Sequence, residues 1–279
     1  MPVLFNQDEA ETKEIAPGVK CQILLDKPRT SNDRIMLQRI LLEPGAQMPL
    51  SIANGSFAWT QLLSGEVIIT AENIKDHLTK AHIALLPPDF EGTLSAETSC
   101  EVLLANVPDA QRFDESFTKN PPGYRCVDWT REPVLDAEHD ARKRIYMVTP
   151  KMFDTKAFKG EMIIYPPNTN APNHHHEGAE HFQYVISGSG TVFLSEQPHD
   201  MKKGDVLYNY EMERHYFENH GEEDFIFVEF FVPGECKTIW VPGADVCAWM
   251  PTGQDIEGRM PVRDIKAHSS ELVTTPDDV

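Results

Sequence analysis

The sequence predicts an all-β protein built of two tandem sandwiches or barrels, and two patterns support this fold class. Short apolar or alternating runs, divided by Pro, Gly and Asn, recur along the chain, whereas helical periodicity is scarce. The order of runs and turns in the first half returns in the second half, about 120 residues later. A chain of 279 residues is long enough for two such domains, each with its own core.

The expected strands follow these runs in order. In the first half they are residues 35–42, 59–63, 67–70, 81–86 and 102–105. In the second half they are residues 144–148, 161–165, 182–186, 191–194, 206–208, 215–218 and 225–232.

The two halves also match in their turns and loops. In each half a Pro-containing loop leads to a strand that ends in Ser-Gly, at Gly65 in the first half and at Gly188 in the second. We therefore expect barrels at residues 1–107 and 142–252, joined by a polar linker at 108–141. Residues 253–279 have little to bury, which predicts a tail that is an irregular cover or frayed.

Charge and cysteine content narrow the classes of partner. Lys and Arg total 25 against 44 Asp and Glu, and the net charge of −19 disfavours nucleic acid or an anionic membrane surface. The five cysteines are widely spaced without a CxxC motif, as expected for reduced thiols. The start lacks a signal-peptide pattern, and no apolar stretch approaches the ~20 residues of a membrane span. We expect a cytoplasmic protein whose partner is a small molecule.

A histidine cluster in the second half points to a metal site. On a strand His174 and His176 share a face, whereas His175 points to the other side. His181 begins the next apolar run, and His215 lies on a third strand that can face it across a barrel. Convergent imidazoles suit Mn, Fe, Ni, Cu or Zn better than Mg or Ca, which prefer oxygen. We predict one divalent transition metal, held by His174, His176, His181 and His215.

The spacing of these residues resembles that of the cupin superfamily, whose motifs are G-x5-H-x-H-x3/4-E-x6-G and G-x5-P-x-G-x2-H-x3-N. His174 and His176 match the first histidine pair, and His181 stands at the glutamate position before Gly188. The second motif is matched by Gly204, His215 and Asn219, whereas Tyr210, Met212 and Asn168 depart from the two motifs. The resemblance implies two tandem cupin barrels, that is, double-stranded β-helices of the jelly-roll type, with the metal in the second.

Glu180 is the alternative third ligand. It satisfies the shorter form of the first spacing but lies one residue too far from Gly188. Only one of Glu180 and His181 can face the interior of a barrel, because neighbouring residues on a strand point to opposite faces. His175 is expected to face solvent or to support a ligand.

Three residues near these ligands are candidate catalytic groups. Gln183 shares a face with His181 and is suited to bond a substrate or to orient a ligand. Tyr208 lies on the apolar run that precedes His215. Glu229 is a carboxylate inside an apolar run, which is costly unless it is partnered, so it is a candidate general base or anchor of a ligand. For Gln183 and Glu229 an ordinary structural or outward-facing role stays open.

The first half departs from the cupin pattern at the ligand positions. Aligned on the two Ser-Gly turns, these positions fall at Ser51, Ala53, Ala58 and near Gly92 or Thr93. None of them offers an imidazole or a carboxylate, so we expect a first barrel without metal. His77 and His82 lie elsewhere in the first half.

The resemblance leaves the reaction open, because cupins include dioxygenases, decarboxylases, isomerases, lyases, hydrolases and binding proteins. An all-histidine site is similar to those of cupin dioxygenases, which implies cleavage beside a carbonyl or enol. Arg144 and Arg214 are candidates to bind an anionic substrate group, although solvated faces are an alternative for both.

A metal-dependent hydrolase or isomerase is a second hypothesis. The run from Glu180 to Gly190 is similar to the E-H-x-x-Y-x-x-S-G-x-G run of the (S)-ureidoglycine aminohydrolase family. That family has a carboxylate where His174 stands and Gln where His215 stands, so the match supports the architecture more than the activity. A non-catalytic small-molecule-binding protein is the third hypothesis. Paired barrels with edge strands to cover lead us to expect a homo-oligomer.

Overall fold

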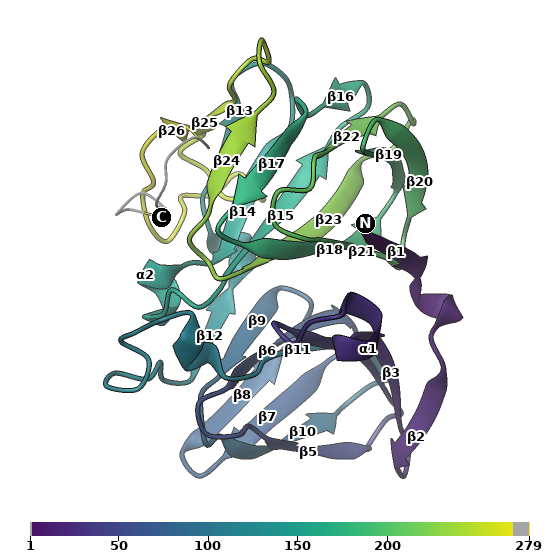
Figure 1. Ribbon diagram of the computed structural model, residues 1–279. Helices are drawn as coiled ribbons and strands as arrows, with labels where there is room; N and C mark the ends of the chain where they lie inside the picture. Colours follow the sequence, from purple (N-terminus) through teal and green to yellow (C-terminus); the bar gives the residue numbers. More distant parts are fainter. Residues whose placement is uncertain (1, 270–278) are drawn as a thin grey trace. The chain divides into compact units, whose positions relative to one another are not determined.

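Short runs of apolar residues separated by Gly, Pro and Asn form strands throughout the computed structural model, which describes residues 2–269 and 279 (Figure 1). The strands fall into two units, which we call the N-terminal barrel (residues 7–129 and 153–155) and the C-terminal barrel (the described parts of 1–6, 130–152 and 156–279). The short helical elements are α1 (Lys27–Thr30), α2 (Pro150–Phe153), η1 (Gln7–Glu9), η2 (Ala110–Arg112) and η3 (Trp129–Arg131). The predicted all-β fold is confirmed.

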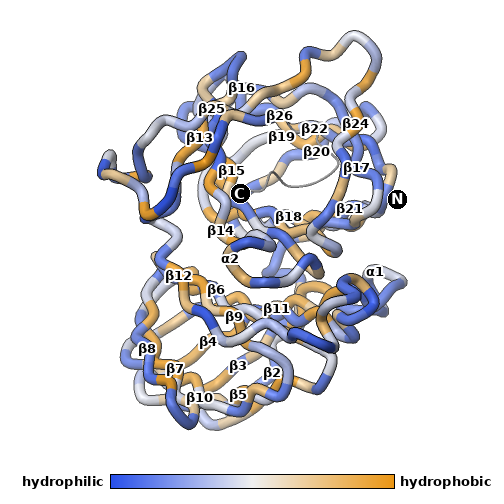
Figure 2. The backbone as a smooth tube through the Cα atoms, turned by 90° about the vertical axis from the view of Figure 1, so that its left-hand side faces the viewer, coloured by the Kyte–Doolittle hydropathy of each residue, from blue (hydrophilic) through white to orange (hydrophobic). Residues whose placement is uncertain are grey.

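The N-terminal barrel consists of two antiparallel sheets. The larger sheet has the order β12 (Arg125–Asp128), β9 (His82–Leu86), β6 (Phe57–Ser64), β11 (Cys100–Val107), β4 (Met36–Leu42), β3 (Val19–Leu25) and β2 (Thr12–Ala16). The smaller sheet has the order β5 (Gln47–Ser51), β10 (Glu91–Ala96), β7 (Val67–Ala71) and β8 (Ile74–Leu78). Figure 2 shows hydrophobic segments along these strands, and the buried core between the sheets includes Leu50, Leu62 and Val102.

The C-terminal barrel repeats this arrangement. Within the described residues its larger sheet has the order β1 (Val3–Asn6), β21 (Asp205–Asn209), β18 (Glu180–Ser187), β23 (Phe225–Val232), β15 (Lys159–Tyr165), β14 (Lys143–Val148), β13 (Val134–Ala137), β25 (Ala248–Pro251) and β26 (His268–Ser269). The smaller sheet has the order β20 (Gln197–Lys202), β19 (Ser189–Leu194), β22 (His215–Asn219), β17 (His174–Glu177) and β24 (Lys237–Trp240), and β16 (Thr169–Asn170) pairs with β22.

The repeated Ser-Gly turn has the same physical basis in both barrels. Gly65 and Gly188 have φ values of 80° and 73°, a backbone region that residues with a Cβ rarely adopt. A Cβ atom would lie 2.4 Å from the carbonyl oxygen of Ser99 at Gly65 and 2.1 Å from that of Asp224 at Gly188. Glycine is therefore required at the same point of both barrels, which supports the internal duplication.

The chain termini and the expected linker take part in the sheets. β1 pairs with β21, so the first residues of the chain complete the larger sheet of the C-terminal barrel. The expected linker, residues 108–141, contains β12, which pairs with β9, and β13, which pairs with β14. The expected tail lies partly outside the described residues, and its described part contains β26. No helix between residues 2 and 269 combines the length and apolar character that crossing a membrane requires.

Candidate metal centre and its cavity

Four histidines come together inside the C-terminal barrel. His174 and His176 lie on β17, His181 on β18 and His215 on β22, where His215 is the register partner of His174. The ring centroids are 4.6 Å apart for His174 and His215 and 4.7 Å apart for His176 and His181. Those of His181 and His215 are 4.8 Å apart. The alternation of side chains along β17 turns His175 away from the cluster.

Hydrogen bonds orient three of these rings through the nitrogen that faces away from the cluster. The Nδ1 atoms of His174 and His215 lie 2.8 Å and 3.0 Å from the carbonyl oxygens of Pro172 and Glu213, to which they can only donate. The Nδ1 atom of His176 lies 3.2 Å from the hydroxyl of Thr238. When Nδ1 carries the proton, Nε2 has a free lone pair. Such contacts are typical of histidines that bind metals.

Burial keeps the four imidazoles neutral. It lowers the pKa of His174, His176 and His181 well below the usual value, and neighbouring histidines add to the effect. Burial also lowers the pKa of His215 to about 4. At neutral pH all four rings are therefore in the neutral form, which has one nitrogen lone pair free to bind a transition metal.

A carboxylate and two amides complete the cluster. Glu229 on β23 lies opposite Gln183 on β18, and the Gln183 amide donates a hydrogen bond to it. The Glu229 carboxylate is 3.5 Å from His181 Nε2. The pKa of Glu229 is raised to about 8, mainly by burial and secondly by the nearby Glu161 carboxylate. Asn209 on β21 approaches both His181 Nε2, at 3.2 Å, and the Gln183 carbonyl, at 3.1 Å.

This donor set has the chemistry of a site for one divalent transition metal. One ligand atom from each of His176, His181, His215 and Glu229 lies within 4.8 Å of all the others, and all four residues are buried. The Nε2 atoms of His181 and His215 are 3.2 Å apart, and His181 Nδ1 is buried without a hydrogen-bond partner. Lone pairs of neutral imidazoles that converge on a buried point suit a borderline cation. His174 packs against His176 and His215 but is not one of these four residues.

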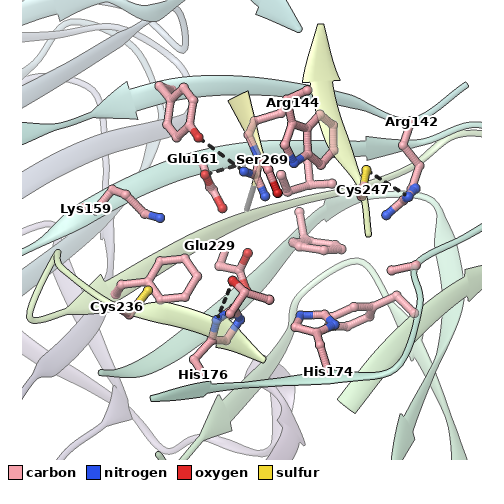
Figure 3. Close-up of a pocket in the computed structure, with 18 of the residues that line it drawn as sticks. Arg142, Arg144, Lys159, Glu161, His174, His176, Glu229, Cys236, Cys247 and Ser269 are labelled. Carbon is pink, nitrogen blue, oxygen red and sulfur yellow. Dashed lines mark hydrogen bonds and ion pairs between the residues drawn. The ribbon is translucent and has the colours of Figure 1, made fainter. Parts of the chain in front are cut away.

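A cavity of about 80 Å³ extends from this cluster into the barrel (Figure 3). His174, His176 and Glu229 form one wall, and aromatic side chains, including Phe231 and Trp249, form much of the rest. A water molecule needs about 10–15 Å³, so the space holds roughly six waters or one small organic molecule.

Three cations line the cavity opposite the histidines: Arg142, Arg144 and Lys159. Arg144 Nε is 3.3 Å from Glu161, and Arg142 Nε is 2.7 Å from Asp140. Lys159 Nζ lies 4.3 Å from the centre of the Phe231 ring, and no carboxylate of the described residues is within ion-pair distance of it. Burial is the largest single effect and lowers the pKa of Lys159, but Glu161, Cys236 and Tyr146 together raise it, so the net shift is upward and the ammonium group stays charged at neutral pH.

Residues 161–231, which hold the whole cluster, match the family profile of the cupin domain. The predicted resemblance to the cupin superfamily is confirmed for this part of the chain. A curated relative of the chain is oxalate decarboxylase OxdC from Bacillus subtilis (strain 168), with 27% identity over 209 residues. The match covers 68% of this chain and 50% of the relative, so the chain spans about half of the relative's length.

Solved structures agree with the fold of this chain. A structure of the B. subtilis oxalate decarboxylase determined in work on its Mn(II) centres superposes with a TM-score of 0.67 at 16% identity, covering 86% of this chain and 79% of the other. A structure of the same enzyme at pH 4.6 also gives 0.67 at 16% identity, covering 86% and 78%. At this identity the likeness concerns the fold alone.

The structure brings most of the predicted site residues together. His181 faces the cluster, whereas Glu180 points to the other face of β18 and accepts a hydrogen bond from the Tyr208 hydroxyl. Tyr208 therefore lies apart from the cavity, because it pairs with Phe182 rather than with the inward-facing His181 or Gln183. Arg144 lines the cavity, but Arg214 is exposed in the turn before β22. The roles of these residues as ligands or catalytic groups stay predictions.

Several cavity residues have no counterpart in the sequence-based prediction. Those that line the cavity are Arg142, Tyr146, Lys159, Glu161 and His268, and Asn209 lies beside His181 in the cluster. Charged residues at alternating positions of apolar strands, as at Lys159 and Glu161, are the signal that could have found two of them. His268 lies in the expected tail, and no pattern in the sequence connects it to the cavity.

Proposed function

We propose that the C-terminal barrel is the active site of a metal-dependent enzyme that cleaves a carbon–carbon bond beside the carboxylate of a small substrate. The observation that carries this proposal is the small cavity with imidazoles on one wall and three cations on the other. A carboxylate held by the cations directs the neighbouring carbonyl, enol or second carboxylate of a short molecule toward the histidines.

His176, His181 and His215 would hold the metal, with His174 or Glu229 as a further ligand. When bound, the metal supplies Lewis acidity that polarises a substrate oxygen, and Mn or Fe also supplies one-electron redox chemistry. Manganese is the first candidate, because the structurally similar oxalate decarboxylase contains Mn(II) centres. Fe, Ni, Cu and Zn suit the same donors.

The chain's own residues bind and enclose the substrate. Lys159 is the cation best suited to a substrate carboxylate, because its charge lacks an ion-pair partner within the described part of the chain. Arg144 is already paired with Glu161, so its guanidinium adds a hydrogen-bond donor in a fixed place. The Phe231 and Trp249 rings exclude water, which strengthens both interactions.

Two reactions agree with this arrangement. Identity to oxalate decarboxylase supports decarboxylation, and the histidine at the usual glutamate position supports a dioxygenase. Both break a carbon–carbon bond next to a carbonyl or carboxylate. A hydrolase or isomerase of the ureidoglycine aminohydrolase type has less support, because His174 and His215 differ from the ligands of that family. A homo-oligomer remains a prediction that size-exclusion chromatography with light scattering would test.

The test is turnover of a panel of small carboxylates by the Mn(II)- and Fe(II)-loaded protein. We would incubate it with oxalate, oxaloacetate, glyoxylate and acetylpyruvate and record CO2 release and O2 uptake together. Carbon dioxide without net O2 consumption identifies a decarboxylase, and cleavage with stoichiometric O2 uptake identifies a dioxygenase. Metal-loaded protein that neither binds nor converts any of these carboxylates would overturn the proposal.

A further inference from the structure

Strand β26, in the last part of the chain, lines the cavity on the side away from the histidine cluster. β26 pairs with β25 and becomes the last strand of the larger sheet, so that His268 and Ser269 line the cavity. His268 is 8% exposed, and Ile265 beside it packs into the hydrophobic cluster that contains Trp249. The segment from 265 to 269 has few apolar residues and is held at the cavity by the buried side chains of Ile265 and His268.

His268 and Tyr146 form a hydrogen-bonded pair at this position. The Tyr146 hydroxyl is 2.8 Å from His268 Nε2, and His268 Nδ1 is 3.0 Å from the carbonyl oxygen of Lys266. A carbonyl oxygen only accepts, so Nδ1 carries the ring proton and Nε2 accepts. The Tyr146 hydroxyl therefore donates to His268.

Arg144 completes the orientation of the pair. Its Nη1 atom is 3.2 Å from the Tyr146 oxygen and can only donate, so this oxygen accepts from Arg144 while its own proton points to His268. The charged groups that act on the pair are Arg144, Lys159 and Glu161. Burial lowers the pKa of His268 and raises that of Tyr146, which keeps both groups neutral and the proton on the phenol.

We propose that Tyr146 is the catalytic acid–base of this site and that His268 acts through it as the store for the transferred proton. When a substrate O–H bond breaks, its proton passes to the Tyr146 oxygen while the phenol proton moves to His268 Nε2; a C–H proton of an enolisable substrate takes the same path and leaves an enolate. In decarboxylation the carbon–carbon bond to the carboxylate then breaks, CO2 leaves, and the electron pair of the bond stays on the remaining substrate carbon. The Tyr146 hydroxyl then forms the new C–H bond, and His268 returns its proton to Tyr146. The two transfers balance, and the inference rests on the function proposed above.

Two single substitutions test the relay. Tyr146→Phe removes only the hydroxyl, and we expect unchanged metal content, carboxylate binding within about 2-fold of the wild type, and a loss in kcat of about 100-fold or more. His268→Gln should keep metal and substrate binding, lower kcat by about 10-fold or more, and remove the acid-side inflection of the kcat–pH profile. Tyr216→Phe is the matched control, because Tyr216 stacks on Phe193 at 4.4 Å and does not line the cavity.

A second measurement separates the failure of the relay from that of the proposed function. In D2O, NMR follows exchange of the methyl protons of pyruvate, an enolisable carboxylate whose proton exchange breaks a C–H bond but no carbon–carbon bond. Exchange that depends on wild-type protein and is lost in Tyr146→Phe supports the relay, even if no member of the panel is cleaved. Cleavage at the wild-type rate by Tyr146→Phe, or exchange that is equal in the two proteins or absent from both, would overturn the relay.

Discussion

The two barrels share a framework of strands and differ in the residues that point into it. β6 and β18 both have eight residues and occupy equivalent places in their sheets, β6 between β9 and β11 and β18 between β21 and β23. Ala58 and His181 are the second residues of these strands and are therefore equivalent. By the same comparison of β11 with β23, Leu104 stands where Glu229 stands. The sheet register supports both pairs, since Leu104 faces Thr60 and Glu229 faces Gln183. A few inward positions thus separate a binding site from an apolar interior.

The cavities reflect the same difference. The N-terminal barrel has a cavity of about 310 Å³ lined mainly by apolar side chains, including Ile40, Met48 and Leu50. The C-terminal cavity has about 80 Å³ and is lined by histidines and cations. Acidic and basic groups can be buried there because Arg144 pairs with Glu161 and because the raised pKa of Glu229 keeps its carboxyl group largely neutral at neutral pH. The comparison teaches that a polar site needs its supporting partners as well as its ligands.

Removing a predicted metal ligand tests the comparison most strongly. His181→Ala places the residue of the N-terminal barrel in the cluster, and we expect metal affinity to fall by more than about 100-fold, beyond the usual effect of a supporting residue. Glu180→Ala is the control, because Glu180 lies on the same strand and faces the other way. Metal analysis of both purified variants checks the prediction. Metal retained by His181→Ala and lost by Glu180→Ala would contradict the assignment.

Acidification should weaken the metal-free C-terminal barrel. Above pH 6.5 the histidines are neutral in both states, but as the pH falls toward 4 the unfolded chain binds protons that the folded barrel does not. Between pH 7 and 5, His215 alone should lower the free energy of unfolding by about 2 kcal/mol. The other three histidines act in the same direction.

Glu229 opposes this trend. Its pKa is raised from 4.5 to about 8 in the folded barrel, so the free energy of unfolding that it contributes is largest below pH 4.5 and is lost as the pH rises toward 8. One carboxyl group does not offset four imidazoles. Urea unfolding of chelator-treated protein at pH 7 and pH 5 measures the net effect. Equal or greater stability at pH 5 would show that the imidazoles are not held neutral by burial.

A third substitution tests the cationic wall. Lys159 and Met36 are the first residues of the equivalent strands β15 and β4, so Lys159→Met again introduces the residue of the other barrel. We expect oxalate to bind about 20-fold more weakly, the range of one charge-assisted hydrogen bond, with metal content unchanged. Calorimetric titration checks this, with the exposed Lys203→Met as control. Oxalate affinity equal to that of the wild type would exclude Lys159 from carboxylate binding.

The smallest effect is expected at a supporting residue. Thr238→Val removes the hydroxyl beside His176 Nδ1 and keeps the shape of the side chain. Metal affinity should fall by about 10-fold, because the ring loses the partner that fixes its orientation. Competition with a chromogenic chelator measures the change. Thr191→Val, whose hydroxyl instead lies near Asp200 on the smaller sheet, should bind metal as the wild type does.

Local pattern was sufficient for the framework and for the histidines. The run at 225–232 predicts β23 at its observed bounds, and the alternation around His174 and His176 selects the inward residues. β3 was not predicted, because its polar residues Lys20 and Gln22 break up the apolar run. The cations that line the cavity, Arg142, Arg144 and Lys159, could not be predicted together either. They lie on or next to β14 and β15, which are buried on both faces, and the sequence does not show which face borders a cavity.

Metal stoichiometry in the full-length protein tests the central claim most directly. Titration of metal-free protein with Mn(II), followed by electron paramagnetic resonance, should give one tightly bound ion per chain, and oxalate should change its spectrum. His181→Ala should lose the tight site, and the N-terminal barrel should add none. No tight binding, two equivalent sites per chain, or full binding by His181→Ala would contradict the account.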